Sequence, residues 1–264
     1  MYLRKLSYCA LLLALLFVVA CGGGKEESSS TTTPAKPAAA PSGGNAYDPA
    51  KSTASITGKA KFEGAKPNLV KIQMSADAVC MKAHTTPVMD QSVVVNDDGT
   101  LQNVFVYVKE GAEKWTYQTP TTPVEIDQQG CLYHPHVLGI MVNQPLTIKN
   151  GDPTLHNIHP QPKINTPFNL AQPMINMQTN KTFDKVEVMI PVKCDVHRWM
   201  ESYIGVLNHP FYSVTGTDGS FTIKGLPAGT YTIEAWHEKY GAQTANVTVT
   251  DGQAATNDFT FKAS

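Results

Sequence analysis

The 264-residue sequence lacks several features that would place it in a common functional class. It has no basic excess, because 21 Lys and Arg residues face 22 Asp and Glu residues, so nothing indicates a nucleic-acid partner. It has no CxxCH motif, which argues against covalently attached c-type haem. Long stretches of helical periodicity are also missing, apart from one or two turns around SADAVCMKAH. The last of these absences favours a protein built mainly from strands.

The first twenty residues, MYLRKLSYCALLLALLFVVA, combine two early basic residues with a short apolar run. The run is too short and too early for a membrane span, so residues 1–20 are predicted to be a signal peptide. It ends in FVVAC, which resembles the lipobox of bacterial lipoproteins, where the cysteine is acylated after cleavage. An ordinary signal peptide followed by a chance cysteine is the alternative. The resemblance implies a lipid anchor on Cys21 and a place in the cell envelope, on the periplasmic side of the outer membrane or at the cell surface.

The next segment, residues 21–51, begins CGGGKEESSSTTTPAKPAAAPSGGN. This composition cannot bury a core, so the segment is predicted to be a disordered tether. About 28 such residues have an r.m.s. reach on the order of 30 Å. The predicted contact with a membrane is therefore through the lipid anchor, with the folded part held above the surface.

The five cysteines leave an odd number for the folded part. Export implies an oxidising compartment, where thiols pair. Cys9 leaves with the signal peptide and Cys21 is assigned to the lipid, so Cys80, Cys131 and Cys194 remain. If two of these pair, the third is either a free thiol or is held by a metal ion.

From residue 52 onward, short runs rich in β-branched and aromatic residues alternate with turns containing Gly, Pro, Asn and Asp. Examples are SITGKAKFEG, VFVYVK, KVEVMIPV and TYTIEAW. The pattern predicts an all-β chain with one or two β-sandwiches.

The C-terminal run VTGTDGSFTIKGLPAGTYTIEAWHEKYG resembles carboxypeptidase regulatory-like domains, which are small transthyretin-like sandwiches. The strands with which such domains begin occur far upstream, as ITGKAKFEG at 56–64 and VFVYVKEG at 104–111. We therefore predict a regulatory-like sandwich made of residues 52–117 and 209–264. A second domain, residues 118–208, is predicted to be inserted between its strands, and two sandwiches in sequence are the alternative.

Two motifs in the predicted insertion contain residue types that bind metals. PLTIKNGDPTLHNIHP contains His156, and KCDVHRWMESY contains Cys194, His197 and Met200 at intervals of three. Such intervals also suit core packing on one face of a helix. Together, however, the two motifs resemble the cupredoxins, the blue copper proteins, with a ligand loop like that of amicyanin. The resemblance implies a Greek-key β-sandwich for residues 118–208.

The resemblance also implies one mononuclear type 1 copper bound by His156, Cys194, His197 and Met200. A trigonal His2Cys site with a weak axial Met is the blue-copper arrangement. Zinc would prefer a fourth hard or thiolate ligand to a thioether. A cysteine nucleophile paired with histidine is possible in principle, but a thiolate beside two imidazoles and a thioether favours a metal. No enzymatic activity is therefore predicted.

Several neighbouring residues receive roles through the same resemblance. Asn157 is expected to brace the ligand loop from the second shell, and His159 to lie beside the site or at the surface. Arg198 and Trp199 would flank a docking patch around His197, whose ring edge faces solvent in amicyanin-like proteins. For Trp199, shielding of the copper from water is the alternative.

With Cys194 assigned to copper, Cys80 and Cys131 are predicted to form a disulfide. His134 and His136 form one HxH pair, which is too few for a multicopper oxidase centre. His84, His209 and His237 are expected to be structural or surface residues.

These inferences predict an exported electron carrier that exchanges single electrons with a redox protein such as a cytochrome, a dehydrogenase or a respiratory complex. The alternative is a Cu(I)-binding lipoprotein that delivers copper as cargo, which the pair Met174 and Met177 would support if it does more than fill space. A weaker third possibility is an adhesion or scaffold protein whose regulatory-like sandwich carries the activity.

Overall fold

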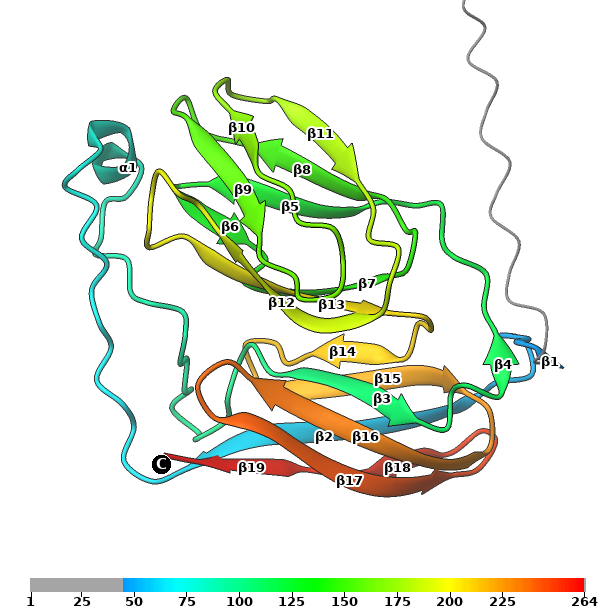
Figure 1. Ribbon diagram of the computed structural model, residues 1–264. Coiled ribbons are helices and arrows are strands. Elements are labelled where there is room, and N and C mark those ends of the chain that lie inside the picture. Colours follow the sequence, from blue (N-terminus) through cyan, green and yellow to red (C-terminus); the bar gives the residue numbers. More distant parts are fainter. Residues whose placement is uncertain (1–44, 264) are drawn as a thin grey trace, which may run out of the picture. The chain divides into compact units, whose positions relative to one another are not determined.

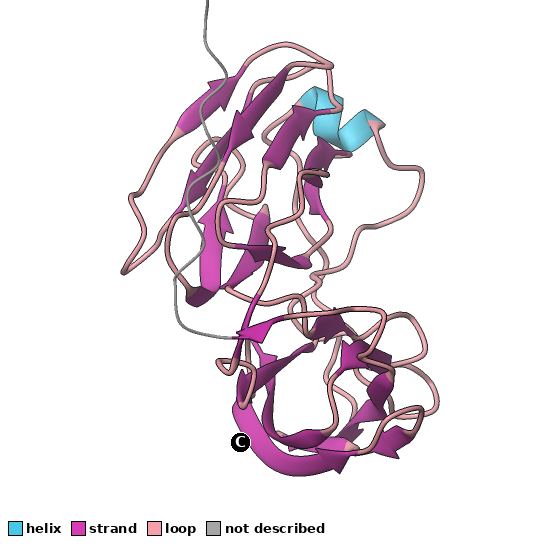
Figure 2. Cartoon of the chain, turned by 90° about the vertical axis from the view of Figure 1, so that its right-hand side faces the viewer, coloured by secondary structure: helices cyan, strands magenta, loops and turns pink. Residues whose placement is uncertain are grey.

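The computed structural model describes residues 45–263. Cys21, the predicted signal peptide and most of the predicted tether lie outside the described residues. Within them, nearly all regular structure is strand, and a single helix, α1 (Ala78–Lys82), falls where the sequence predicts one or two turns (Figure 2). No helix in residues 45–263 is long and apolar enough to cross a membrane. The prediction of an all-β chain is confirmed.

The first sandwich takes strands from both ends of the described chain (Figure 1). One sheet has the order β14 (Tyr212–Val214), β3 (Phe105–Glu110), β16 (Gly229–His237) and β17 (Gly241–Val249). In the other, β2 (Ala54–Glu63) pairs with β15 (Ser220–Leu226), β18 (Ala254–Thr256) and β19 (Phe259–Lys262). Alternate residues of β2, including Ile56, Ala60 and Phe62, face the core that these sheets enclose.

The second sandwich consists of a five-stranded and a four-stranded sheet. The five-stranded sheet has the order β10 (Leu170–Gln172), β9 (His156–Pro160), β12 (Glu187–Lys193), β13 (Glu201–Leu207) and β7 (Val137–Met141). The four-stranded sheet has the order β11 (Gln178–Lys181), β8 (Leu146–Asn150), β5 (Val124–Gln129) and β6 (Leu132–His134). A short pair, β1 (Asn45–Ala46) with β4 (Trp115–Thr116), forms a separate two-stranded sheet, and Trp115 packs against the core of the first sandwich.

The segment of residues 72–88 contributes to the second core although it belongs to the range 52–117 predicted for the first sandwich. Met74 and Cys80 are buried in the second core, and Ile72 and Val88 pack against it. The ends of the segment are held together, because the Ile72 amide donates to the Val88 carbonyl at 2.9 Å. The predicted domain limits themselves stay a prediction.

Two paired glycines let aromatic rings from the first sandwich approach the second closely. Gly139 of β7 and Gly205 of β13 are register partners. A Cβ atom on Gly139 would lie 2.2 Å from Cε2 of Tyr212, and one on Gly205 would lie 2.5 Å from Cζ of Phe105. The Tyr212 hydroxyl also donates to the Gly139 carbonyl at 2.9 Å. Only residues without a side chain leave room for this packing.

The sheet register places the two motifs side by side. In the antiparallel pair β9–β12, His159 lies opposite Lys193, so the loop that follows β12 comes to lie beside the beginning of β9. That loop is closed by backbone hydrogen bonds, from the Cys194 amide to the Met200 carbonyl at 3.3 Å and from the Met200 amide to the His197 carbonyl at 2.9 Å. His156, the first residue of β9, therefore meets the loop of residues 194–200.

Candidate metal centre

Three of the four predicted ligands converge at the end of the second sandwich. Donor atoms of His156, Cys194 and His197 all lie within 4.8 Å of one another. The Nδ1 atoms of the two histidines are 2.9 Å apart, and Sγ of Cys194 is 3.9 Å from Nδ1 of His197. Met200 is fully buried in the same core cluster as Cys194. The set is enclosed, since His156, Cys194 and His197 are 0%, 1% and 2% exposed.

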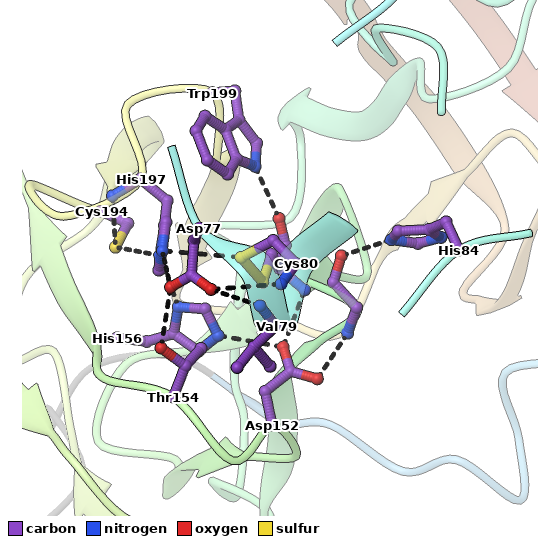
Figure 3. The surroundings of a disulfide bond; sticks show 12 residues. Asp77, Val79, Cys80, His84, Asp152, Thr154, His156, Cys194, His197 and Trp199 are labelled. Atoms are coloured by element: carbon purple, nitrogen blue, oxygen red, sulfur yellow. Dashed lines mark hydrogen bonds and ion pairs between the residues drawn. A yellow bond between two sulfur atoms is a disulfide. The ribbon is translucent and has the colours of Figure 1, made fainter. Parts of the chain in front are cut away.

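Each histidine ring has a carboxylate at its outer nitrogen (Figure 3). Nε2 of His156 donates to Oδ2 of Asp152 at 2.9 Å, and Nε2 of His197 donates to Oδ2 of Asp77 at 3.2 Å. Carboxylates in this position fix the ring tautomer and orientation and increase the basicity of the other nitrogen. Both Nδ1 atoms are thereby left to face a shared point.

The electrostatics of the cluster suit deprotonated sulfur. Burial raises the pKa of Cys194, but hydrogen bonds from His156 and from the backbone amides of Asn157 and His197 lower it more, so that it ends below its usual value. Burial likewise lowers the pKa of His156, yet the hydrogen bonds to Asp152 and Cys194 raise it to about 8. A thiolate rather than a thiol is the species that binds metals.

Asn157 braces the ligand loop. Its Oδ1 atom accepts from the amide of Asp195 at 2.7 Å and from that of Val196 at 3.4 Å, and it lies 3.3 Å from Sγ of Cys194. His159 does not join the cluster, because its Nδ1 atom lies 3.1 Å from Oδ2 of Asp195 at the partly exposed margin of the loop.

Cys80 and Cys131 form a disulfide, and Cys194 is the free cysteine among residues 45–263. The disulfide lies against the candidate centre, with Sγ of Cys80 only 3.6 Å from Nε2 of His197 (Figure 3). Paired sulfurs are not thiolates, so the disulfide adds no sulfur ligand of that kind.

The expected solvent-facing edge of His197 is absent from the described structure, and that prediction is wrong. His197 is 2% exposed because Asp77 and Cys80 lie at its outer nitrogen. On another side of His197, the centroids of the Trp199 ring and the imidazole are 5.0 Å apart. Nε1 of Trp199 donates to the Cys131 carbonyl at 3.0 Å. Arg198 is exposed and Trp199 half-buried, and Val196 on the other side of His197 in the sequence is exposed as well.

The other side chains that were considered as metal ligands lie elsewhere. Met174 is 65% exposed in the connection between β10 and β11, and Met177 is half-buried in the same connection. His134 interacts with the Gln129 carbonyl, and His136 is bound to the carboxylate of Glu238.

Sequence reasoning missed both carboxylates. Asp152 stands four residues before His156 within the same motif, so its position could have drawn attention. Asp77 lies far from both motifs in the sequence, and no spacing pointed to it.

The residues present fit a copper ion. Two imidazole nitrogens, a sulfur favoured as thiolate and a buried thioether are the donor set that accepts both Cu(I) and Cu(II). The two rings are held by Asp152 and Asp77 and the loop backbone by Asn157 before any ion binds.

One comparison with known proteins concerns the C-terminal part of the chain. Residues 206–262 match the carboxypeptidase regulatory-like domain family, as the sequence resemblance predicts. No curated protein matches the chain.

Cupredoxins and a copper enzyme are among the solved structures that the chain resembles. A Cu-containing nitrite reductase from Thermus scotoductus is 22% identical, and the match covers 34% of this chain and 23% of the reductase chain, with a TM-score of 0.29. A purple cupredoxin from Nitrosopumilus maritimus is 20% identical over 31% of this chain and 98% of its own, with a TM-score of 0.28. A mutant of amicyanin in its Cu(I) form is 17% identical over 38% of this chain and 97% of its own, also with a TM-score of 0.28. Such low scores transfer no activity, so the function has to come from the side chains described above.

Proposed function

We propose that the chain is an exported, membrane-anchored type 1 copper protein that carries single electrons between redox partners and is not an enzyme. The observation that supports this most is the enclosed meeting of the Nδ1 atoms of His156 and His197 with the sulfur of Cys194. When bound, copper supplies a one-electron couple to this set. His156, Cys194, His197 and Met200 would hold it.

The protein's own contribution to electron transfer is rigidity. Asp152 and Asp77 hold the two rings, Asn157 holds the loop backbone, and every predicted ligand is buried. A site that keeps one geometry in both oxidation states needs little rearrangement when an electron arrives or leaves.

The contact with a redox partner is proposed at Arg198 and Trp199. Trp199 touches the imidazole of His197 and is half-buried, while Arg198 is exposed beside it. Trp and Arg are the residue types that most often concentrate binding energy at interfaces. A cytochrome, a dehydrogenase or a respiratory complex on the same membrane is the proposed class of partner.

The proposal is tested by reconstituting the soluble chain, without its lipid anchor, with Cu(II). We expect an intense visible thiolate-to-copper band and a reversible one-electron wave. Cys194→Ser should abolish the band, whereas Met200→Gln should shift the reduction potential and keep the band. A colourless Cu(II) form with no electrochemical response would show that the chain is not a type 1 copper protein.

Copper delivery is the second candidate, because Met174 is strongly exposed and lies three residues from Met177. Delivery requires preferential Cu(I) binding and rapid release to a chelator, and both should weaken in a Met174→Leu, Met177→Leu double variant. An electron carrier should instead hold copper in both oxidation states with no effect of that variant.

A further inference from the structure

We propose that Asp77 is the positioning residue of His197 and that the Cys80–Cys131 disulfide holds Asp77 in place. This inference rests on the proposed function, because the His197 ring that Asp77 positions is a predicted copper ligand. We call residues 72–88 the cover, because this segment closes the outer edge of His197.

The cover is attached to the second sandwich at several points. Its helix α1 carries Cys80, whose disulfide partner Cys131 lies between β5 and β6. His84 interacts through Nε2 with the Gly130 carbonyl at 2.6 Å, and Met74 is buried in the core. The two ends of the cover are closed by the bond from the Ile72 amide to the Val88 carbonyl. The disulfide is the one covalent attachment in this set, and it lies three residues from Asp77.

The two oxygens of Asp77 have different tasks. Oδ1 caps α1 by accepting from the amides of Val79 at 2.7 Å and Cys80 at 3.3 Å. Oδ2 accepts from the Thr154 hydroxyl at 3.0 Å and faces Nε2 of His197 at 3.2 Å. The cap therefore orients the carboxylate so that its second oxygen meets the imidazole.

This arrangement selects one tautomer of His197. A carboxylate oxygen can only accept, so Nε2 has to carry the hydrogen and Nδ1 keeps its lone pair. Nδ1 is the atom that lies 2.9 Å from Nδ1 of His156 and 3.9 Å from the sulfur of Cys194. Asp77 thus presents the metal-binding nitrogen to the other ligands while taking no place among them.

The decisive variant is Asp77→Asn. Asparagine is also a good helix cap, so its oxygen is expected to keep the amides of Val79 and Cys80. Its NH2 group then replaces Oδ2 and donates toward Nε2 of His197, which favours the tautomer with hydrogen on Nδ1. Asp77→Ser is the matched control, since serine retains the cap and is too short to reach the ring.

Two readouts are measured on these variants. In the metal-free protein, imidazole ¹⁵N shifts should report the Nε2–H tautomer of His197 in the wild type, the Nδ1–H tautomer in Asp77→Asn and a mixture in Asp77→Ser. In the reconstituted protein, Cu(II) affinity should fall by roughly 10- to 100-fold in Asp77→Asn, the range seen for partners of metal-bound histidines, and by less in Asp77→Ser.

The disulfide is tested with the Cys80→Ala, Cys131→Ala double variant. In metal-free wild type, His197 should resist diethyl pyrocarbonate, whereas the exposed His134 should react. In the double variant, His197 should react at a rate approaching that of His134. If this variant fails to fold, the Asp77→Asn and Asp77→Ser tautomers still decide the role of Asp77, and reaction of wild-type His197 before and after disulfide reduction decides that of the disulfide.

The outcomes separate the two proposals. An unchanged tautomer and unchanged copper affinity in Asp77→Asn would overturn the positioning role, and continued protection of His197 without the disulfide would overturn the anchoring role. If the tautomer changes as expected while the wild type binds no copper, the positioning of His197 stands and the proposed function fails.

Discussion

Acid should destabilise the protein through His209, a buried histidine that is not among the predicted copper ligands. His209 is 5% exposed, and both ring nitrogens are used: Nε2 donates to the Val108 carbonyl at 2.9 Å and Nδ1 accepts from the Phe211 amide at 3.2 Å. Protonation would destroy the second bond by turning its acceptor into a donor. Burial lowers the pKa of His209 from 6.5 to about 4.

The sign follows from the proton count. Between pH 6.5 and pH 4 the unfolded chain binds a proton at this residue that the folded chain does not, so stability falls as the pH falls through that window. At pH 4.5, two units below the unfolded value, the loss is about 2–3 kcal/mol, since each unit corresponds to about 1.4 kcal/mol. His237, whose pKa burial also lowers to about 4, should add a similar loss.

Urea unfolding of metal-free wild type and His209→Gln at pH 7 and pH 4.5 isolates the contribution. Glutamine can still donate to Val108 but has no charge to gain, and His237 is present in both proteins. The wild type should therefore lose about 2–3 kcal/mol more than the variant between the two pH values. Equal losses in the two proteins would refute the assignment of His209 as a neutral buried residue.

Two further predictions concern the contact between the sandwiches and the second carboxylate. Gly139→Ala should lower the free energy of unfolding by about 1–3 kcal/mol, because its Cβ would overlap the Tyr212 ring. In denaturant unfolding, part of this loss should be recovered when Tyr212→Leu is added. If the losses of the two substitutions simply add, the cause is not steric. Asp152→Asn should weaken Cu(II) binding by roughly 10- to 100-fold, since its carboxylate serves the amide of Gly130 as well as Nε2 of His156. Competition titration with a chelator measures the Cu(II) affinity, and Asp218→Asn, at an exposed position, is the control. Equal Cu(II) affinities for the two variants would contradict a role for Asp152.

The ligand motifs could be found from sequence because they are local. Cys194 and His197 lie on one loop, and the period of two along β9 predicts that His159 leaves the site while His156 enters it. The disulfide followed from counting once Cys194 had been assigned to copper.

What could not be predicted depends on tertiary packing. The covering of His197 comes from Asp77 and Cys80, which reach the ring from a segment distant in the sequence. The sequence of the loop would be the same whether His197 faced solvent or was covered. The resemblance therefore pointed to side chains that do come together, His156, Cys194 and His197, and misjudged the exposure of His197.

The pairing of β2 has a consequence for the order in which the chain can fold. Ile56 of β2 lies opposite Ile223 of β15 and Ala255 of β18, so β2 has to wait for partners that are synthesised much later than itself. The second sandwich needs no residue beyond Leu207 for its sheets and can form first. A chain truncated before β15 would then keep the residues of the candidate metal centre but expose β2 as an unpaired apolar strand, an open edge of the kind that promotes aggregation.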